Sequence, residues 1–361
     1  MKEMPTHKLK EGMVIGEDVM TKGGQRILTK GKVLTLQSIM RLSFYNIKSV
    51  QILPFDSTAE DGGTLSVAPK AYSQEIKASP KFHSFQVDHT KVLHTIQENF
   101  ENYVNSDIPL DSSALLSNVK ELFRSCKTSL ELFNMLHNMH ASADSIYAHC
   151  LNVSLICRQL GKWLKLDEDT LDLLTLCGLL HDIGKLKIPD EILNKPGKYT
   201  DEEFALVKMH TQHSYDLLKD LPLDPHVRQA ALYHHERCDG SGYPMGLKLE
   251  EADEFALAVA IADVYDAMTA ARSYRAPLCP FQVIDRFEKE GLQKYHPKYI
   301  LTFLRQVAGT YQNHRILMSD GRSATIVMLN KQSLSRPIVR LDNDICIDLS
   351  TEQSLSIQAV V

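Results

Sequence analysis

The sequence predicts a mainly α-helical protein, a helical bundle with a small β-rich module before it and a β-rich tail after it. Between residues 85 and 312, apolar side chains recur at helical spacing in many successive segments. Before residue 54 and after residue 313, short apolar runs bounded by turn formers replace that pattern. A chain of 361 residues is long enough for two or three domains with buried cores.

Composition indicates an ordinary globular chain, with 43% hydrophobic and 24% charged residues. The net charge of -5 argues against binding of bulk nucleic acid but allows a small anionic ligand. No apolar stretch is long enough to predict a membrane span, and Met1 to Pro5 show no signal-peptide core. The seven cysteines lack Cys-x-x-Cys spacing, which favours reduced thiols and a cytoplasmic location.

Turn formers and breaks in periodicity predict five parts. Their expected boundaries are an N-terminal α+β module at 1–53, a linker at 54–84, a helical connector at 85–140, a helical domain at 141–312 and a β-rich tail at 313–361. The N-terminal module shows no catalytic constellation. It is interpreted as a surface for a homodimer or a signalling partner, with a purely structural role as the alternative.

Short strands are expected in both β-rich parts. In the N-terminal module they are Val14–Ile15, Arg26–Leu28 and Ser49–Leu53, with a turn at Gly23–Gly24 and a helix over Thr35–Phe44. In the tail they are Ala324–Met328, Ile338–Arg340, Ile345–Ile347 and Leu355–Val361, with a turn at Asp320–Gly321.

Histidine is concentrated in the helical part, where nine of fifteen fall between His137 and His235. Such clustering favours a metal site, because histidine is the commonest metal ligand. His137 and His140 lack a carboxylate at helical spacing, so a capped or solvated pair is favoured there. His149 lies beside a broad apolar stripe, where a lone histidine is usually a core residue.

Two pairs of adjacent polar residues end predicted helices. His181-Asp182 follows the apolar run 171–180, and Gly184 lets that helix end. His234-His235 ends the helix that starts at Pro225. Neighbours on a helix point about 100° apart, so each pair reaches a metal cluster most easily at a helix end. A plain C-terminal cap is the alternative for the first pair.

Further polar residues lie on neighbouring helices. His210 lies on a helix that begins after the capping box Thr200-x-x-Glu203. Asp263 and Asp266 share an apolar helix face, where a carboxylate needs a metal or a cation as partner. The glycine-rich loop 239–246 follows the second histidine pair. A substrate-facing loop is favoured there over a plain connection.

The order of these residues resembles the HD superfamily of metal-dependent phosphohydrolases, and closely its HD-GYP branch. The resemblance covers about residues 140 to 310. It rests on His181-Asp182-Ile183-Gly184-Lys185, on His234-His235-Glu236 with Asp239-Gly240-Ser241-Gly242-Tyr243-Pro244, and on the segment 261–269, Ile-Ala-Asp-Val-Tyr-Asp-Ala-Met-Thr. It implies hydrolysis of cyclic di-GMP to pGpG or GMP by hydroxide activated at a metal pair.

The resemblance also implies residue roles. The implied metal ligands are His149, His181, Asp182, His210, His234, His235 and Asp263. Asp182 would bridge the ions, and Lys185 would serve catalysis by contacting a phosphate. The implied substrate-binding residues are Lys185, Gly242, Tyr243, Pro244, Asp266, Arg272 and Arg275.

Four positions depart from the family pattern, and two of them, Thr211 and Ser214 in place of the usual proline and glycine after the third histidine, are expected to matter little. Ser145 stands where members with a third metal carry glutamate, so two divalent ions are predicted. Iron or manganese would suit the imidazole and carboxylate ligands. Arg275 replaces a phosphate-binding lysine of some members and keeps the charge. Two alternatives stay open, because base recognition is not legible in the motifs: a hydrolase of another cyclic dinucleotide, and a non-catalytic cyclic di-GMP sensor.

Overall fold

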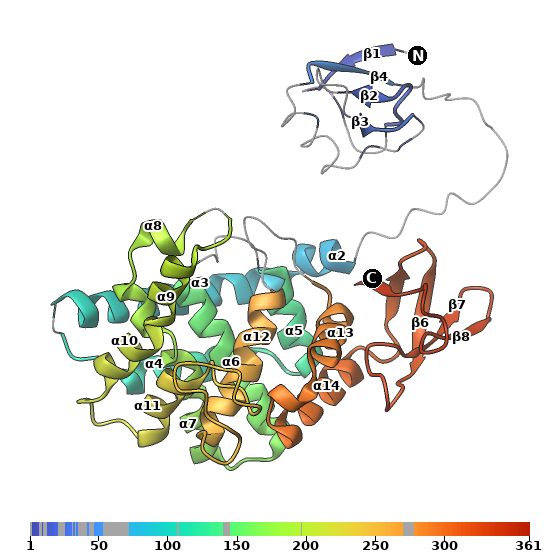
Figure 1. Cartoon of the computed structure of the whole chain (residues 1–361). Coiled ribbons are helices and arrows are strands. Elements are labelled where there is room, and N and C mark those ends of the chain that lie inside the picture. Colours follow the sequence, from blue (N-terminus) through green and yellow to red (C-terminus); the bar gives the residue numbers. More distant parts are fainter. Residues whose placement is uncertain are drawn as a thin grey trace. The chain divides into compact units, whose positions relative to one another are not determined.

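The protein divides into two compact units, Met1–Val67 and Ala68–Val361 (Figure 1). This computed structural model describes residues 2–6, 9, 13–20, 26–30, 32, 34, 42, 47–52, 72–106, 108–139, 145–195, 197–269 and 278–361. Within these ranges, no helix is both long and apolar enough to cross a membrane. All seven cysteines carry free thiols, as their spacing predicts.

The first unit contains two antiparallel strand pairs. Strand β1 (Lys2–Pro5) pairs with β4 (Ser49–Ile52), and β2 (Val19–Met20) pairs with β3 (Arg26–Leu28). A small apolar core of its own lies between them. Ile15 forms only an isolated bridge to the β4 residue Ile52.

The strands predicted at Arg26–Leu28 and from Ser49 are confirmed. A strand at Val14–Ile15 is not formed. Strand β1 was not predicted, because its sequence Lys-Glu-Met-Pro has no apolar alternation. The Gly23–Gly24 turn and most of the helix expected over Thr35–Phe44 lie outside the described residues.

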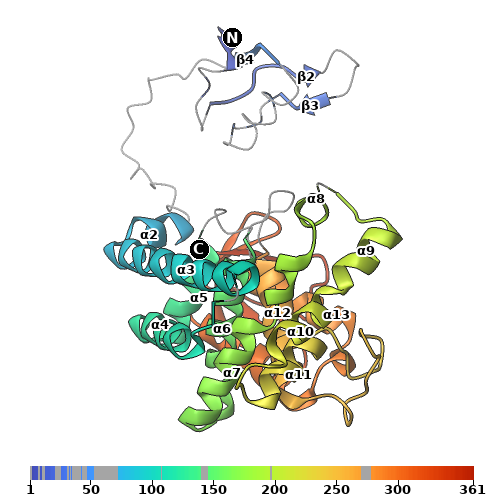
Figure 2. The same cartoon turned by 90° about the vertical axis from the view of Figure 1, so that its left-hand side faces the viewer.

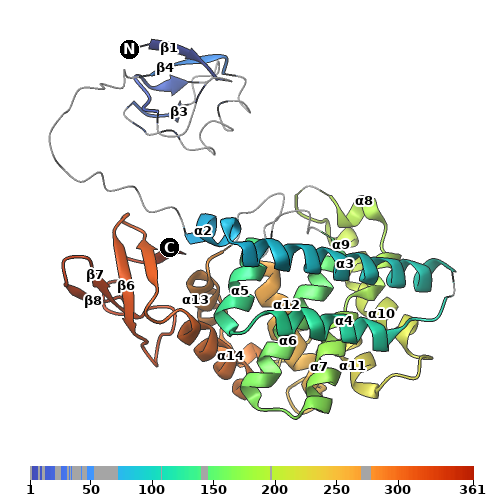
Figure 3. The same cartoon turned by 180° about the vertical axis from the view of Figure 1, so that it is seen from behind.

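The second unit is mainly helical, which confirms the predicted fold class (Figures 1 and 3). Its helices are α2 (Tyr72–Ala78), α3 (Pro80–Ser106), α4 (Ser112–Ser125), α5 (Ser129–Asn138), α6 (Ile146–Leu164), α7 (Glu168–Leu180), η2 (Ile183–Lys187), α8 (Asp190–Leu193), α9 (Asp201–Lys208), α10 (His210–Leu218), α11 (Pro225–Tyr233), α12 (Glu254–Thr269), α13 (Pro280–Glu290), η3 (Leu292–Lys294) and α14 (Pro297–Thr310).

The helix starts follow from local capping. Asp167 accepts a hydrogen bond from the backbone N–H of Thr170 at the start of α7. Thr200 and Glu203 form the predicted capping box of α9. Asp224 caps α11, whose first residue is Pro225, a position that has no need of an N–H donor.

Helix α6 forms the centre of the bundle, beside α7 and α12 (Figure 2), and it also packs against α14 (Figure 3). Its residues from Cys150 to Gly161 are all buried. An aromatic cluster ties its C-terminal half to the other helices. In it, Phe133 stacks on Trp163 with ring centroids 5.7 Å apart, and Tyr265 meets Phe303 edge-on at 5.0 Å. Helix α6 is therefore held in place by close packing in the core of the bundle.

Helix α2 and the first residues of α3 lie within the segment 54–84, which was predicted as a linker. Pro80 occupies the first position of α3, where proline is tolerated because no N–H donor is needed. Ser79 caps this helix by accepting from the N–H of Phe82 at 3.1 Å. Phe82 and Phe85 are buried in the bundle core.

The C-terminal part is a five-stranded antiparallel sheet, as its β-rich sequence predicts. Its strands are β5 (Arg315–Met318), β6 (Ser323–Met328), β7 (Ile338–Leu341), β8 (Cys346–Asp348) and β9 (Ile357–Val360), in the order β8-β7-β6-β5-β9. Strand β5, which was not assigned individually from the sequence, pairs with both β6 and β9.

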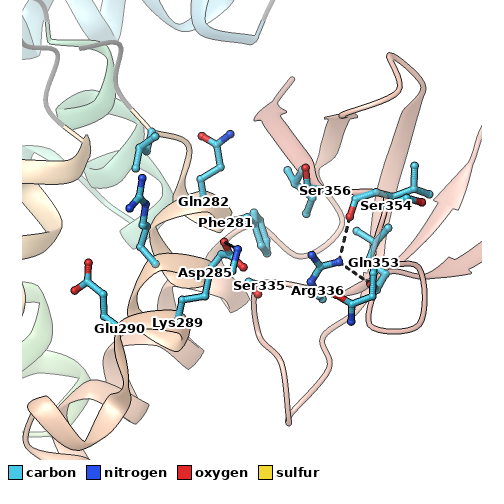
Figure 4. A pocket seen from close by; sticks show the side chains of 15 residues that line it. Phe281, Gln282, Asp285, Lys289, Glu290, Ser335, Arg336, Gln353, Ser354 and Ser356 are labelled. Carbon is cyan, nitrogen blue, oxygen red and sulfur yellow. Dashed lines mark hydrogen bonds and ion pairs between the residues drawn. The ribbon is translucent and has the colours of Figure 1, made fainter. Parts of the chain in front are cut away.

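A cavity of about 590 Å³ lies between α13 and the C-terminal sheet (Figure 4). On the sheet side, Arg336 donates hydrogen bonds to the carbonyl oxygens of Leu349 and Leu355, each at 3.1 Å. Glu288 of α13 accepts from the N–H of Leu334, which ties the sheet segment to the helix. None of the predicted site residues that the structure describes lines this cavity.

Candidate metal centre

The side chains that the family resemblance implies as metal ligands converge inside the helical bundle. They are His149 on α6, His181 and Asp182 at the end of α7, His210 at the start of α10, His234 and His235 at the end of α11, and Asp263 on α12. Residues up to 114 positions apart in the chain thus meet in one place.

Asp182 lies in the middle of this centre and is fully buried. Its Oδ2 is 3.4 Å from Nε2 of His149 and 3.3 Å from Nε2 of His181. Its other oxygen, Oδ1, is 3.2 Å from Nε2 of His210 and 3.6 Å from Nε2 of His234. One carboxylate therefore faces two separate groups of histidines, as a ligand shared by two ions would.

Two groups of side chains have the spacing of metal ligands. In the first, made by His149, His181 and Asp182, the ligand atoms all lie within 4.8 Å of one another. The second group, His210, His234 and His235, meets the same limit. Asp263 lies between the groups, with Oδ1 3.0 Å from His149 Nε2 and Oδ2 3.8 Å from His235 Nδ1.

Backbone carbonyls hold three of the rings in position. Nδ1 of His181 donates to the carbonyl of Gly178 at 2.8 Å, and Nδ1 of His210 donates to that of Val207 at 2.6 Å. Nδ1 of His234 has two such carbonyls within 3.1 Å. A carbonyl only accepts, so the proton lies on Nδ1 and the Nε2 lone pair points into the centre. This is the usual outer arrangement of metal-binding histidines.

Two buried polar atoms of the centre have no hydrogen-bond partner among the described residues. They are Nε2 of His181 and Oδ1 of Asp182. A buried polar atom without a partner is costly, and such atoms usually mark a bound water or ion. Both are the atoms that a metal would bind, so the donor set fits divalent ions.

The histidines are held in the form that binds metals. Burial lowers the pKa of His181, and it lowers the pKa of His210 to about 3. Burial also lowers the pKa of His235 well below its ordinary value. These rings are therefore neutral at physiological pH, as metal coordination requires.

The carboxylates keep their charge in spite of burial. Burial raises the pKa of Asp182, but the charge of Lys185 and the hydrogen bond with His149 outweigh it and hold that pKa well below the usual range. Burial likewise opposes ionisation of Asp263, and the hydrogen bond from His149 more than compensates. Buried negative charge of this kind calls for cations.

His149 differs from the other rings, because three carboxylates surround it. Burial lowers its pKa, but hydrogen bonds to Asp182, Asp263 and Asp266 outweigh burial and raise the pKa well above its ordinary value. Its Nδ1 lies 2.7 Å from Oδ2 of Asp266. A metal at Nε2 must therefore displace a proton from this ring.

A close approach of two backbones brings His210 to the His181-Asp182 pair. The N–H of Gly184 in η2 donates to Oγ of Ser214 in α10 at 2.8 Å. A Cβ at Gly184 would lie 2.2 Å from the carbonyl oxygen of His210 and 2.3 Å from the backbone nitrogen of Ser214. Only glycine fits between these elements without displacing one of them.

Buried Glu236 anchors the loop that follows the second histidine pair. Its Oε1 accepts from the N–H groups of Met245 and Gly246, and its Oε2 accepts from that of Leu247, all within 3.1 Å. At Gly242, an added Cβ would lie 2.5 Å from the carbonyl oxygen of His235. The loop is thus pressed against the metal centre.

The structure describes five of the seven residues predicted for substrate binding. Tyr243 lies over the ring of His235, with centroids 4.6 Å apart. Lys185 forms an ion pair with Oδ2 of Asp182 and remains partly exposed. Gly242 adjoins His235, and Pro244 is exposed on the same loop. Asp266 contacts His149 from behind. Arg272 and Arg275 lie outside the described residues.

Some roles were missed at the sequence level. Glu236 was predicted only as part of a motif, and no local pattern marks it as a loop anchor, because its partners are backbone N–H groups about ten residues later. His137 is partly buried and lies against two tyrosines. Its ring nitrogens lie 3.1 Å from the hydroxyl of Tyr265 and 3.4 Å from that of Tyr311. His140 lies outside the described residues.

Comparisons with known proteins agree with this centre. A family model described as "HD domain" matches residues 113–299. A cyclic di-GMP phosphodiesterase of Pseudomonas aeruginosa, PA4108, is 35% identical over 207 residues, which are 57% of this chain and 50% of the relative. A cyclic di-GMP phosphodiesterase of Thermotoga maritima is 35% identical over 178 residues, 49% of this chain and 48% of the relative.

A third relative is named for another substrate. The 3'3'-cGAMP-specific phosphodiesterase 2 of Vibrio cholerae is 34% identical over 177 residues, 48% of this chain and 34% of the relative. The chain thus spans half or less of the length of these relatives.

Among solved structures, Bd1817, an HDG"Y"P protein from Bdellovibrio bacteriovorus, has the same fold. Its TM-score is 0.52 at 18% identity, with 84% of this chain and 97% of that chain covered. The family model covers slightly more than half of this chain, and the predicted motifs meet in one centre. The resemblance predicted from the sequence is therefore confirmed, and the chain belongs to the HD-domain family.

Proposed function

We propose that the protein is a metal-dependent phosphodiesterase that hydrolyses cyclic di-GMP to pGpG, GMP or both. The observation that carries this proposal is the position of Asp182, whose two oxygens face two separate groups of histidines. The relatives named for cyclic di-GMP support the choice of substrate.

The proposed metal ligands are the seven residues of the centre, His149, His181, Asp182, His210, His234, His235 and Asp263. Two divalent ions, iron or manganese, bound by these side chains would supply Lewis acidity and water activation at neutral pH. With Ser145 serving as the N-cap of α6, the site is proposed to hold two ions rather than three.

The chain's own residues then position the substrate. Lys185 keeps its positive charge, because burial lowers its pKa but the charge of Asp182 outweighs burial and raises it. It is partly exposed beside Asp182 and can balance the charge of a phosphate. Gly242, Tyr243 and Pro244 are proposed to face the substrate, and so are Arg272 and Arg275. Asp266 is proposed to act chiefly through His149.

Two alternatives retain support. The relative named for 3'3'-cGAMP favours a hydrolase of that dinucleotide. A sensor that binds cyclic di-GMP without cutting it would also use this site. In each case we propose a cytoplasmic protein whose N-terminal module binds a second copy or a signalling partner.

The direct test is to incubate the full chain anaerobically with Fe(II) or Mn(II) and each dinucleotide, and to separate the nucleotides by chromatography. We expect pGpG or GMP from cyclic di-GMP, abolished by a chelator. Faster cleavage of 3'3'-cGAMP would show that this dinucleotide, and not cyclic di-GMP, is the preferred substrate. Binding of cyclic di-GMP without product, in fully metallated protein, would show that the protein is a sensor.

A variant pair tests the centre itself. Asp182→Ala should lose metal and activity together. Asp342→Asn, an exposed residue of the C-terminal sheet paired with Arg315, is the matched control and should keep both. If Asp182→Ala kept its metal and full activity, the proposed mechanism would be wrong.

A further inference from the structure

Helix α9 presents an aromatic ring and a cation beside the metal centre. The rings of Phe204 and Tyr243 meet edge-on, with centroids 6.5 Å apart. Nζ of Lys208 lies 4.9 Å from the centroid of Phe204 and 5.7 Å from that of Tyr243. Tyr243 in turn lies over His235 of the centre. A continuous row of contacts thus leads from α9 to a proposed metal ligand.

The two α9 residues share one face, because positions i and i+4 of a helix are neighbours. We call this surface the Phe204–Lys208 face. Phe204 is 45% exposed, and Lys208 forms no ion pair with any residue that the structure describes. A single exposed phenylalanine is ordinary. An exposed ring together with an unpaired cation, both touching the loop that covers the metal ligands, is a combination that favours a ligand.

The position of this face is fixed. The capping box of Thr200 and Glu203 starts α9, and Nζ of Lys195 binds both carboxylate oxygens of Glu203 at 2.6 and 2.7 Å. At its other end, α9 leads directly into α10, whose first residue is His210. Phe204 and Lys208 are therefore held at a set distance from the centre.

The proposed substrate needs contacts beyond the centre. A cyclic dinucleotide has two phosphodiesters and two purine bases, and only one phosphodiester can occupy the metal centre while it is cleaved. Lys185 already contacts Asp182. A further cation would stabilise the second phosphate beside the proposed arginines, and each base gains from an aromatic surface, because base stacking on an aromatic side chain is sequence-tolerant and strong.

We propose that the Phe204–Lys208 face is part of the substrate site: Phe204 stacks on one base, and Lys208 pairs with the phosphodiester that is not being cleaved. This inference rests on the proposed function, since it assumes a cyclic dinucleotide in the same site. It assigns binding roles to two residues of α9, and it gives neither of them a role in the chemistry.

The test measures equilibrium binding of cyclic di-GMP, and of 3'3'-cGAMP, to the metal-loaded full chain, with turnover recorded in parallel. Phe204→Ala and Lys208→Met should each raise the Kd at least about tenfold. Phe204→Tyr and Lys208→Arg should restore most of the affinity. Lys208→Met should also flatten the salt dependence of binding, which Phe204→Ala should leave unchanged.

Leu206→Ala is the matched control. Leu206 is 50% exposed on the same helix. It is two residues from both Phe204 and Lys208, so its side chain points away from the Phe204–Lys208 face. The control should bind as the wild type does. If Leu206→Ala weakened binding as much as Phe204→Ala, the effect would come from the fold of α9, and the inference would fail.

The outcomes separate this inference from the proposed function. Weakened binding in both variants upholds the inference even if the wild type binds without cutting, a result that would overturn the hydrolase proposal alone. Wild-type affinity in both variants overturns the inference whether or not the protein turns over. A wild type that binds neither dinucleotide overturns both.

Discussion

Oδ2 of Asp266 lies 2.7 Å from Nδ1 of His149, the ring nitrogen that does not face Asp182. A carboxylate behind a metal-binding histidine fixes the ring and strengthens it as a donor. Because Asp266 and Asp263 lie three residues apart on α12, one helix face supplies both a proposed ligand and the support of another.

Replacing Asp266 should therefore weaken metal binding more than substrate binding. We expect Asp266→Ala to weaken metal binding about ten- to hundredfold, since removal of such an outer partner has effects of that size. Metal titration followed by mass spectrometry of the bound ions measures this. Unchanged metal affinity with a higher KM would instead favour the substrate contact that the sequence resemblance implies.

Glu236→Gln tests the loop anchor. The new amide places a donor against backbone N–H groups that need acceptors, so the free energy of unfolding should fall by about 1–3 kcal/mol. Tyr243 should lose its fixed position over His235 and KM should rise. Urea unfolding and steady-state kinetics provide the readouts.

Glu251→Gln is the control for that loop, because the exposed Glu251 accepts from the N–H of Lys248 and from no other residue that the structure describes. It should change the stability by less than about 0.5 kcal/mol, as surface substitutions generally do. Equal losses in both variants would count against a special role for Glu236.

Gly184→Ala should disrupt the contact between η2 and α10. The new methyl group would meet backbone atoms of His210 and Ser214, so one of the two elements must shift. We expect a loss of about 1–3 kcal/mol, as for overpacking of a core, together with weaker metal binding. Gly309→Ala, in a helix with no atom near the new methyl, should instead gain about 0.5–1 kcal/mol. The melting temperatures of both variants distinguish a steric clash at position 184 from a general effect of replacing glycine by alanine.

The stability of the protein should fall in mild acid because of His137. Burial lowers the pKa of this ring from 6.5 to about 4. Between these values the unfolded chain binds a proton that the folded chain rejects, so stability is complete above about pH 6.5 and is lost as the pH falls towards 4. The shift corresponds to a loss of up to about 3 kcal/mol.

The measurement is the free energy of unfolding of wild type and His137→Asn in urea from pH 7 to pH 4. The variant should be less stable at pH 7, because it loses the contacts with two tyrosines. Its disadvantage should shrink as the pH falls, since it has no ring to keep neutral. A difference that stays constant over this range would contradict the assignment.

Local signals in the sequence predicted much of this molecule. The capping box at Thr200 and the proline at the start of α11 appear as expected, because caps depend on residues within one turn. The ligand set came from the order of motifs that resemble a known family. Its convergence was implied by that resemblance and is now visible in the distances around Asp182.

What was not predicted depends on contacts distant in sequence. His137 meets tyrosines 128 and 174 positions away, and no local pattern announces such partners. Glu236 binds a loop about ten residues later, so its role required the fold of that loop. The start of α3 was missed because a proline at the first position of a helix and a proline in a linker cannot be told apart by local sequence.

The two groups around Asp182 offer unequal donors. The group of His149 and His181 has two imidazoles, and oxygens of Asp182 and Asp263 lie 3.4 and 3.0 Å from Nε2 of His149. The other group has three imidazoles, with Oδ1 of Asp182 3.2 Å from Nε2 of His210 and Oδ2 of Asp263 more distant, at 3.8 Å from Nδ1 of His235. Oxygen-rich sites suit manganese, and imidazole-rich sites suit ions later in the first transition row. We therefore expect the pair to fill in two distinguishable steps. In a cell that supplies several metals, the identity of the ions bound at the two proposed sites would therefore depend on which metals were abundant when the protein was made.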